Sequence, residues 1–309
     1  MEDKVLIFGH KNPDTDSICS SLIMEKLAKH HNVDAEAVRL GTVNKETGYV
    51  LNYLKVEEPR LIEKVEKGQK LILVDHNEAA QSIDGRDDAK VLAVIDHHRI
   101  ADFITNEPLY YLAKPYGCTA TLLFEEYKKE GLEIDKVIGT LMISAIISDT
   151  LLLKSPTCTQ KDIEAVKELE DITGLKADEY GLEMLKAGTD LSTYSSEEVI
   201  NLDAKEFNAD SKKFVISQVN TADIDDVFAR REELEFAMEK EISDKKLNIF
   251  IFVITDIINT NSKIIVLGSD KDIVEKAFNK KLDEFDSMIL EGVVSRKKQI
   301  APQILDAAK

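Results

Sequence analysis

The first half of the chain alternates short apolar runs with segments of helical periodicity. Residues 5–8, 71–74 and 91–95 are wholly apolar, which is typical of buried parallel strands. Residues 16–31 place Ile18, Leu22, Ile23 and Leu27 on one helical face. Further strands are expected at 37–40 and 110–113, and further helices at 48–54, 119–129 and 137–148. This alternation predicts an α/β fold, with a mostly parallel sheet and helices on both faces.

The second half begins after a helix end at Gly188. Ser195 or Ser196 is expected to cap a new helix, with Glu197 and Glu198 near its positive end. Strands are expected at 213–219, 249–255 and 263–266, with one long charged helix at 225–244. At 309 residues the chain is long for a single core. We therefore expect a catalytic domain at 1–188, a linker at 189–194 and a smaller α/β domain at 195–309.

Acidic and imidazole side chains gather where the predicted strands end. The clusters contain His10, Asp14 and Asp16, then Asp75 and His76, then Asp96, His97 and His98, and finally Asp149 at the end of an apolar helix. Because ligands bind at the carboxyl ends of strands in open α/β sheets, these side chains are expected to converge. Aspartate with histidine and without thiolate favours Mn, Co, Fe(II) or Zn over Mg or Ca. The pattern predicts a two-metal hydrolytic site.

Each cluster also has a structural alternative. Asp14 or Asp16 could only cap the following helix, Asp75 could only begin a turn, and Asp149 could be a surface cap. The joint placement of four of the six histidines at one edge favours the metal site. By contrast, His30 and His31 close a helix, where their charge suits its negative end.

A second candidate region is basic. Arg296, Lys297 and Lys298 are consecutive in an otherwise acidic protein, and Lys205 lies in the sequence Asp-Ala-Lys-Glu. Three adjacent cations could form an ordinary solvated surface. They could also form a cationic lid over a polyanion, because Arg offers a bidentate fork to phosphoryl oxygens and Lys a point charge.

Composition excludes several classes of function. A net charge of −18 argues against nucleic acid or an anionic membrane as partner. The three cysteines have no zinc-ligand spacing and suggest no disulfide framework. Residues Met1–Lys4 lead into a strand without a leader segment, and no apolar run approaches the ~20 residues of a membrane helix. A cytoplasmic location is expected.

The motifs together resemble those of the family II, manganese-dependent inorganic pyrophosphatases of the DHH phosphoesterase superfamily. The resemblance covers nearly the whole chain. It rests on His10–Ser17, Asp75–Glu78, Asp96–Arg99, Ser148–Thr150 with Lys154–Thr157, and the terminal Ser295–Gln299. The last of these distinguishes pyrophosphatases within the superfamily.

The resemblance implies a role for each candidate residue. His10 and Asp14 would bind one manganese ion, Asp16, His97 and Asp149 the other, and Asp75 both. Lys205, Arg296 and Lys297, from a substrate-clamping DHHA2-like domain, would hold the phosphate under attack, and His98 would lie beside the leaving phosphate. The family also implies Co²⁺ as a possible substitute, Mg²⁺ arriving with pyrophosphate, and a homodimer formed through the first domain.

The expected reaction is hydrolysis of pyrophosphate to two orthophosphates by a metal-bridged hydroxide, at a two-metal site between the two domains. One alternative is another DHH-type phosphoesterase, acting on oligonucleotides, cyclic dinucleotides or polyphosphate. No glycine-rich substrate motif follows residue 190, and the chain lacks tryptophan for base stacking. A non-catalytic acidic binding protein would explain the charge but not the order of the four clusters.

Overall fold

The computed structural model describes residues 4–209 and 212–309. The chain divides into two compact units, Met1–Gly188 and Thr189–Lys309. Residues 1–3, on which the expected absence of a leader partly rests, lie outside the described residues. No helix in the described part of the chain is long and apolar enough to cross a membrane.

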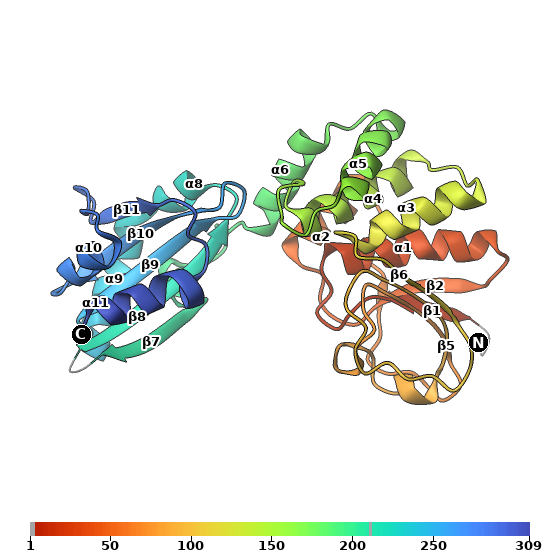
Figure 1. Cartoon of the computed structure of the whole chain (residues 1–309), viewed down its shortest axis with the longest axis horizontal. Coiled ribbons are helices and arrows are strands. Elements are labelled where there is room, and N and C mark those ends of the chain that lie inside the picture. Colours follow the sequence, from red (N-terminus) through yellow and green to blue (C-terminus); the bar gives the residue numbers. More distant parts are fainter. Residues whose placement is uncertain (1–3, 210–211) are drawn as a thin grey trace. The chain divides into compact units, whose positions relative to one another are not determined.

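Six parallel strands form the sheet of the first unit, in the order β3-β2-β1-β4-β5-β6 (Figure 1). The strands are β1 (Val5–Phe8), β2 (Ala35–Arg39), β3 (Arg60–Leu61), β4 (Lys70–Val74), β5 (Lys90–Asp96) and β6 (Tyr110–Ala113). The chain runs outward from β1 to β3, then returns and runs outward from β4 to β6. The strand order therefore reverses between β1 and β4, where α/β sheets bind their ligands.

Six helices form a layer on one face of this sheet (Figure 1). They are α1 (Thr15–His30), α2 (Lys45–Leu54), α3 (Thr119–Glu130), α4 (Lys136–Thr150), α5 (Gln160–Thr173) and α6 (Ala177–Gly188). Helix α4 packs against α1, α3, α5 and α6 and is buried along most of its length, which explains why it is apolar on all sides. Asp135 caps it, as predicted, by accepting from the Ile138 amide.

The opposite face of the sheet is covered differently from the sequence prediction. Its core combines strand residues with Ile62, Val65 and Ile83 from irregular connections. Short 3₁₀ turns η1 (Ala79–Gln81) and η2 (Arg86–Asp88) lie in these connections. The predicted fold class is confirmed, but α-helices cover one face only, because the β4–β5 and β5–β6 crossovers contain no α-helix.

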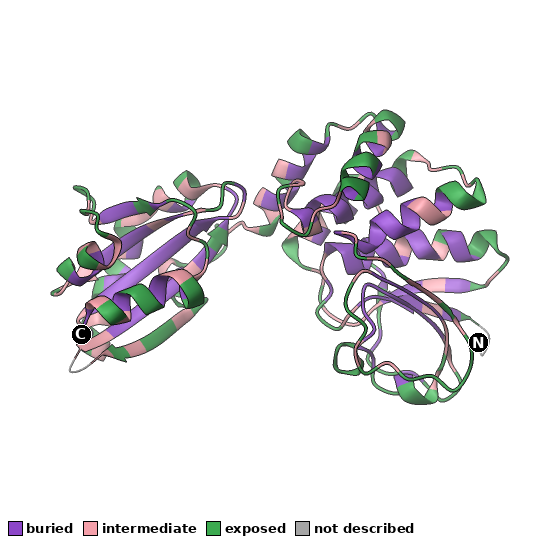
Figure 2. Ribbon diagram, in the orientation of Figure 1, coloured by how far each residue is buried: buried purple, intermediate pink, exposed green. Residues whose placement is uncertain are grey.

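The second unit is a mixed five-stranded sheet in the order β11-β10-β9-β8-β7. The strands are β7 (Ala204–Ala209), β8 (Lys212–Thr221), β9 (Ile249–Asp256), β10 (Asn261–Gly268) and β11 (Ser287–Leu290). Only the β8–β9 pair is parallel. Strand β9 is buried along its whole length (Figure 2), and both sheet faces carry apolar clusters.

Helices cover both faces of the second sheet. They are α7 (Ser196–Asn201), α8 (Ile224–Phe228), α9 (Arg231–Lys245), α10 (Asp272–Phe278) and α11 (Ala301–Ala307), with a short helical turn η3 (Arg296–Ile300) before α11. Residues of α7 and α9 pack in one cluster, and those of α10 and α11 in the other. Ser195 caps α7 in a reciprocal capping box with Glu198.

One local prediction was wrong. The helix expected at 225–244 is two helices, α8 and α9; Asp223 caps the first, and Arg230 between them donates to the Leu191 and Tyr194 carbonyls. The helix expected at 137–148 extends to Thr150, so Asp149 lies in its last turn. The consecutive cations lie in η3, which begins at Arg296.

Candidate metal centre

The turn between β1 and α1 brings His10 and Asp14 together. Asp14 caps α1 by accepting from the Ser17 amide at 3.0 Å, while its other oxygen lies 3.3 Å from Nε2 of His10. A side chain at Gly9 would collide with Ser17, with its Cβ 2.4 Å from the Ser17 Cβ. This close approach lets the turn fold back onto the helix. Asp14 is thus both a cap and a candidate ligand.

Asp75 is the central carboxylate of the cluster. It follows β4 in a left-handed conformation, with φ of 58°, which is strained for a residue with a side chain. Its side chain is buried, and its oxygens lie 3.5 Å from His10 Nε2, 3.3 Å from His97 Nε2 and 3.6 Å from His98 Nδ1. The strain therefore coincides with the point where three imidazoles meet.

Asp16 and Asp149 approach the same volume from α1 and α4. Asp16 is fully buried and accepts from the amides of Thr119 and Ala120, which begin α3. Oδ2 of Asp149 is buried and has no hydrogen-bond partner among the described residues. Such an oxygen is costly to bury unless it binds a cation.

These side chains form overlapping groups that all include Asp75. Ligand atoms of His10, Asp14 and Asp75 lie within 4.8 Å of one another, and so do those of Asp16, Asp75, His97 and Asp149. Asp75, His97 and His98 form a third such group. The Nδ1 of His97 donates to the Tyr116 carbonyl oxygen at 3.1 Å, which leaves Nε2 free to face the cluster. All six residues predicted as metal ligands are therefore brought together.

The electrostatics of the cluster point to a cation. Burial, followed by the charge of Asp16, raises the pKa of Asp75 and of Asp149 well above the ordinary value. Burial opposes the charged form of His10 and of Asp14, but their mutual hydrogen bond and charge outweigh it, raising the pKa of His10 and lowering that of Asp14. Two carboxyl groups with a raised pKa, Asp75 and Asp149, therefore form a site whose charge a divalent ion would neutralise.

His98 lies at the rim of the cluster. Its side chain is 52% exposed, in contrast to the buried Asp75. Its Nδ1 donates to Asp96 at 2.9 Å, and this hydrogen bond is the largest cause of a raised pKa at His98. Asp96 is in turn held by the side-chain amide of Asn77 at 2.6 Å. The imidazole is therefore oriented by a buried acid, with Nε2 not engaged in that contact.

Sequence reasoning missed the residues that position these ligands. Ser17 donates to Asp75 and Ser20 to Asp16, at 2.7 and 2.6 Å. Glu46 on α2 accepts from Thr15 and from Ser148, which are sequence neighbours of candidate ligands. Ser20 could have been predicted, because its hydroxyl lies one helical turn after the predicted ligand Asp16. The residues around Glu46 contain no comparable indication.

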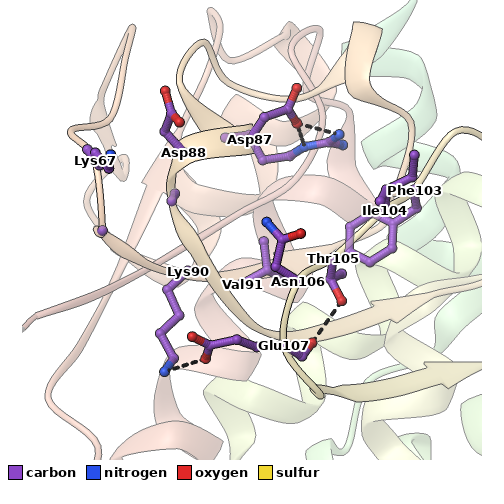
Figure 3. A pocket seen from close by; sticks show the side chains of 13 residues that line it. Lys67, Asp87, Asp88, Lys90, Val91, Phe103, Ile104, Thr105, Asn106 and Glu107 are labelled. Atoms are coloured by element: carbon purple, nitrogen blue, oxygen red, sulfur yellow. Dashed lines mark hydrogen bonds and ion pairs between the residues drawn. The ribbon is translucent and has the colours of Figure 1, made fainter.

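One pocket of the first unit lies away from the cluster. A pocket of about 460 Å³ is formed at the amino ends of β4 and β5 by residues including Lys67, Lys90 and Glu107 (Figure 3). Lys90 pairs with Glu107 at 2.7 Å, and the Arg86 guanidinium with the neighbouring Asp87 at 2.9 Å. Since these charges neutralise one another at the strand ends opposite to the cluster, this pocket is a poor candidate for the metal centre.

In the second unit, the predicted cations differ in exposure. Arg296 is 7% exposed, and its guanidinium donates to the carbonyl and carboxylate oxygens of Asp203. Lys297 beside it is exposed, as is Lys205 on β7. The Arg296 side chain is thus buried and fixed by Asp203, unlike an ordinary solvated cation at the surface.

Comparisons with known proteins agree with the motifs. Residues 4–146 match the N-terminal domain of the DHH family, and residues 182–307 match the DHHA2 domain. The manganese-dependent inorganic pyrophosphatase of Bacillus subtilis is 54% identical over 306 residues, which cover 99% of each chain. A Bacillus velezensis protein named "Probable manganese-dependent inorganic pyrophosphatase" is 55% identical over 306 residues, again 99% of each chain.

A solved structure extends the agreement to the fold. The crystal structure of a Methanococcus jannaschii protein assigned to the family II inorganic pyrophosphatases aligns with a TM-score of 0.63 at 40% identity. The alignment covers 98% of this chain and 99% of that one. The similarity therefore extends over both units.

Proposed function

This chain belongs to the manganese-dependent inorganic pyrophosphatases, and from that premise we propose a division of roles among its side chains. The protein is a manganese-dependent hydrolase of inorganic pyrophosphate, which confirms the function predicted from the motifs. The proposal concerns the residues, the number of metal ions and the assembly.

Two manganese ions per subunit fit the ligand cluster. We assign His10 and Asp14 to one ion, Asp16, His97 and Asp149 to the other, and Asp75 to both. The observation that carries this assignment is the overlap of the ligand groups at Asp75, together with the buried Oδ2 of Asp149, which no hydrogen bond satisfies and which lies 3.7 Å from His97 Nε2. When bound, manganese supplies Lewis acidity toward a phosphoryl oxygen and lowers the pKa of water. Co²⁺ suits the same donors.

The remaining side chains bind the substrate. Lys205, Arg296 and Lys297 supply positive charge to the phosphoryl oxygens of pyrophosphate, which arrives with Mg²⁺. His98 holds a proton for the leaving phosphate at Nε2, since Nδ1 is committed to Asp96. We propose residues 1–188 as the metal-binding domain, 189–194 as a linker and 195–309 as the substrate-binding domain.

The assembly proposed is a homodimer through the first unit, in the cytoplasm. Strand β6 is at the edge of its sheet, and Tyr110 on it is 47% exposed. An open strand edge is a template for pairing with a second chain. A sedimentation-velocity experiment with the wild-type protein would give a dimer, whereas a monomer at micromolar concentration would contradict the proposal.

The assignment of substrate and metal roles is tested by one kinetic comparison. The protein is preincubated with Mn²⁺ and assayed in Mg²⁺ for phosphate release from pyrophosphate, a short oligonucleotide and long-chain polyphosphate. Pyrophosphate is expected to be hydrolysed far faster than the other two. Arg296→Ala/Lys297→Ala is expected to lower kcat/KM about 10²-fold with manganese content unchanged, since these cations act on substrate rather than on metal.

The control is Lys298→Ala, which removes a neighbouring exposed cation with no assigned role. Its kcat/KM should stay within about twofold of wild type, the size expected for a solvated surface charge. Equal losses in the two variants would show a general charge effect, and preferred hydrolysis of the oligonucleotide would favour the phosphodiesterase alternative.

A further inference from the structure

Three polar side chains lie next to one another on one face of the second sheet, beside a large apolar cluster. They are Gln218 on β8, Thr255 on β9 and Ser262 on β10, and we call them the polar row. By the alternation of strand residues, the same face carries Phe214, Ile216, Ile251, Val253, Ile264 and Val266, all in the cluster covered by α10 and α11. Thr255 and Ser262 are buried almost completely.

Hydrogen bonds connect the polar row in one direction. Gln218 Nε2 donates to Thr255 Oγ1 at 2.7 Å, and Thr255 Oγ1 lies 2.9 Å from Ser262 Oγ. Ser262 donates its only hydroxyl proton to the Val293 carbonyl at 2.7 Å, so Thr255 must donate to Ser262. This series of hydrogen bonds therefore ends on the backbone of residues 293–299, which carry Arg296, Lys297 and Lys298 and which we call the basic segment.

The basic segment is held at its start by the same residues. The amide of Gln218 donates to the Val294 carbonyl at 2.9 Å and accepts from the Arg296 amide at 3.2 Å, which brackets Ser295. Gln299 closes the turn by accepting from the Val294 and Ser295 amides. The position of Arg296 Cα is thereby fixed on the sheet.

The polar row satisfies three backbone groups of the segment that carries Arg296, namely the Val293 and Val294 carbonyls and the Arg296 amide. Apolar side chains at the three positions would pack on the sheet but would leave these backbone groups without their partners. The contacts of the polar row end on the segment that carries Arg296 and Lys297. We infer that Gln218, Thr255 and Ser262 are positioning residues that place these cations for phosphate binding. The inference rests on the phosphate-binding role proposed above.

The test replaces the row by apolar residues of similar size, in the variant Gln218→Met/Thr255→Val/Ser262→Ala. We expect a folded protein whose midpoint of urea unfolding is lowered, since three backbone groups lose their partners, and whose manganese affinity is unchanged. We also expect kcat/KM for pyrophosphate to fall about tenfold or more, because small displacements of a binding group cost up to ~10²-fold. Unchanged kcat/KM in the folded variant would overturn the inference.

A double-mutant cycle separates positioning from a general structural effect. In the Arg296→Ala/Lys297→Ala background, loss of the polar row should lower kcat/KM by less than about twofold, because the groups it positions are gone. A loss as large as in the wild-type background would also overturn the inference. If Arg296→Ala/Lys297→Ala itself retains full kcat/KM, the proposed phosphate-binding role fails instead.

Two further variants complete the experiment, one as a control and one as a milder change. Asn248→Leu removes another side-chain amide that joins strands of this sheet, by accepting from the Lys213 amide and donating to Asp270. Its kcat/KM should be unchanged even if the unfolding midpoint drops. Ser262→Ala alone removes one hydroxyl. If the triple variant does not fold, this single variant should still lower kcat/KM about threefold, and an unchanged value would count against the inference.

Discussion

The metal cluster and the basic segment differ in the kind of charged group they use and in how these groups are held in place. The cluster uses ionisable side chains that extend from strand ends and helix ends, and its carboxylates are buried against one another. The basic segment uses permanent cations whose backbone is held by neutral amides and hydroxyls. All six histidines of the chain precede residue 99, so the second unit has none.

This difference predicts different sensitivities. Function that depends on the cluster should respond to metal removal and to pH, because its groups titrate and are stabilised by a cation. Function that depends on the basic segment should respond to geometry but not to metal, since Arg and Lys stay charged at neutral pH. Variants in the first unit can therefore break or sharpen the contrast.

The largest effect is expected from Asp75→Asn. This change removes a charge from the carboxylate common to the ligand groups, while the amide keeps nearly the same shape. Manganese content should fall and kcat should drop by about 10³-fold or more, as for loss of a central electrostatic group. Metal analysis and initial rates test this. The control is Asp84→Asn, which alters a carboxylate that is 77% exposed and should change neither manganese content nor kcat. Full manganese content in Asp75→Asn would refute the role of Asp75 as a shared ligand.

His98→Gln should give the next largest effect. The side chain lies at the rim and is oriented by Asp96, so its loss should lower kcat about 10²-fold, the contribution of a general acid, while both metal sites remain filled. Stopped-flow or steady-state rates and metal analysis measure the two quantities. Exposed His31→Gln is the matched control. Loss of manganese in His98→Gln would make His98 a ligand and enlarge the cluster.

The sequence was most informative about the first unit. Continuous apolar runs mark parallel strands buried on both faces, and the ends of such strands must share one edge. His10, Asp75 and His97 could therefore be predicted as neighbours although 65 and 22 residues separate them in turn. The left-handed backbone at Asp75 and the unpartnered oxygen of Asp149 required coordinates.

The sequence was less informative about the second unit. Strand β7 alternates weakly and is mostly exposed, so its apolar pattern is faint and Lys205 was not placed on a strand. The polar row depends on the register of β8 against the β9–β10 hairpin, and helices α8 and α9 separate β8 from that hairpin in sequence. A lone Gln218, Thr255 or Ser262 inside an apolar run indicates nothing until that register is known.

The pH dependence of stability should follow the first unit. Burial lowers the pKa of His76 from 6.5 to about 4, and this effect outweighs the hydrogen bond to the Val74 carbonyl, which raises the pKa. Between these pH values His76 binds more protons in the unfolded chain than in the folded one, so its contribution to the free energy of unfolding falls as pH falls. From pH 7.5 to 5 this contribution falls by about 2 kcal/mol, while Asp75 and Asp149, whose pKa is raised, act in the opposite direction. Urea unfolding in EDTA measures the free energy of unfolding at each pH.

The matched comparison is His76→Gln, which keeps hydrogen-bonding capacity without a group that titrates in this range. Its loss of unfolding free energy between pH 7.5 and 5 should be about 2 kcal/mol smaller than that of wild type. Other titrating groups act in both proteins and cancel. Equal losses would mean that His76 is not the source of the acid sensitivity.

The smallest effect concerns Glu46, which links the two helices that carry the cluster. Its Oε1 accepts from Thr15 Oγ1 at 2.6 Å and from Ser148 Oγ at 2.5 Å. Thr15 lies between two candidate ligands and Ser148 precedes another. A Cβ at Gly188 would lie 2.8 Å from that of Glu46, so the end of α6 packs directly on this side chain.

Glu46→Ala should therefore loosen the spacing between the ligands of α1 and that of α4 without removing any ligand. Manganese affinity should fall about tenfold, as for other residues that orient metal ligands, while kcat at saturating Mn²⁺ stays within about threefold. Isothermal titration of the metal-free protein gives the affinity. Glu25→Ala is the control. Glu25 also lies on α1 and accepts a hydrogen bond from the Ala37 amide, but among the described residues its hydrogen bonds do not involve the neighbours of the ligands. Equal affinity losses in both variants would assign the effect to helix packing. An unchanged affinity in Glu46→Ala would show that Glu46 does not set the spacing of the ligands, in contrast to the role inferred for the polar row at the basic segment.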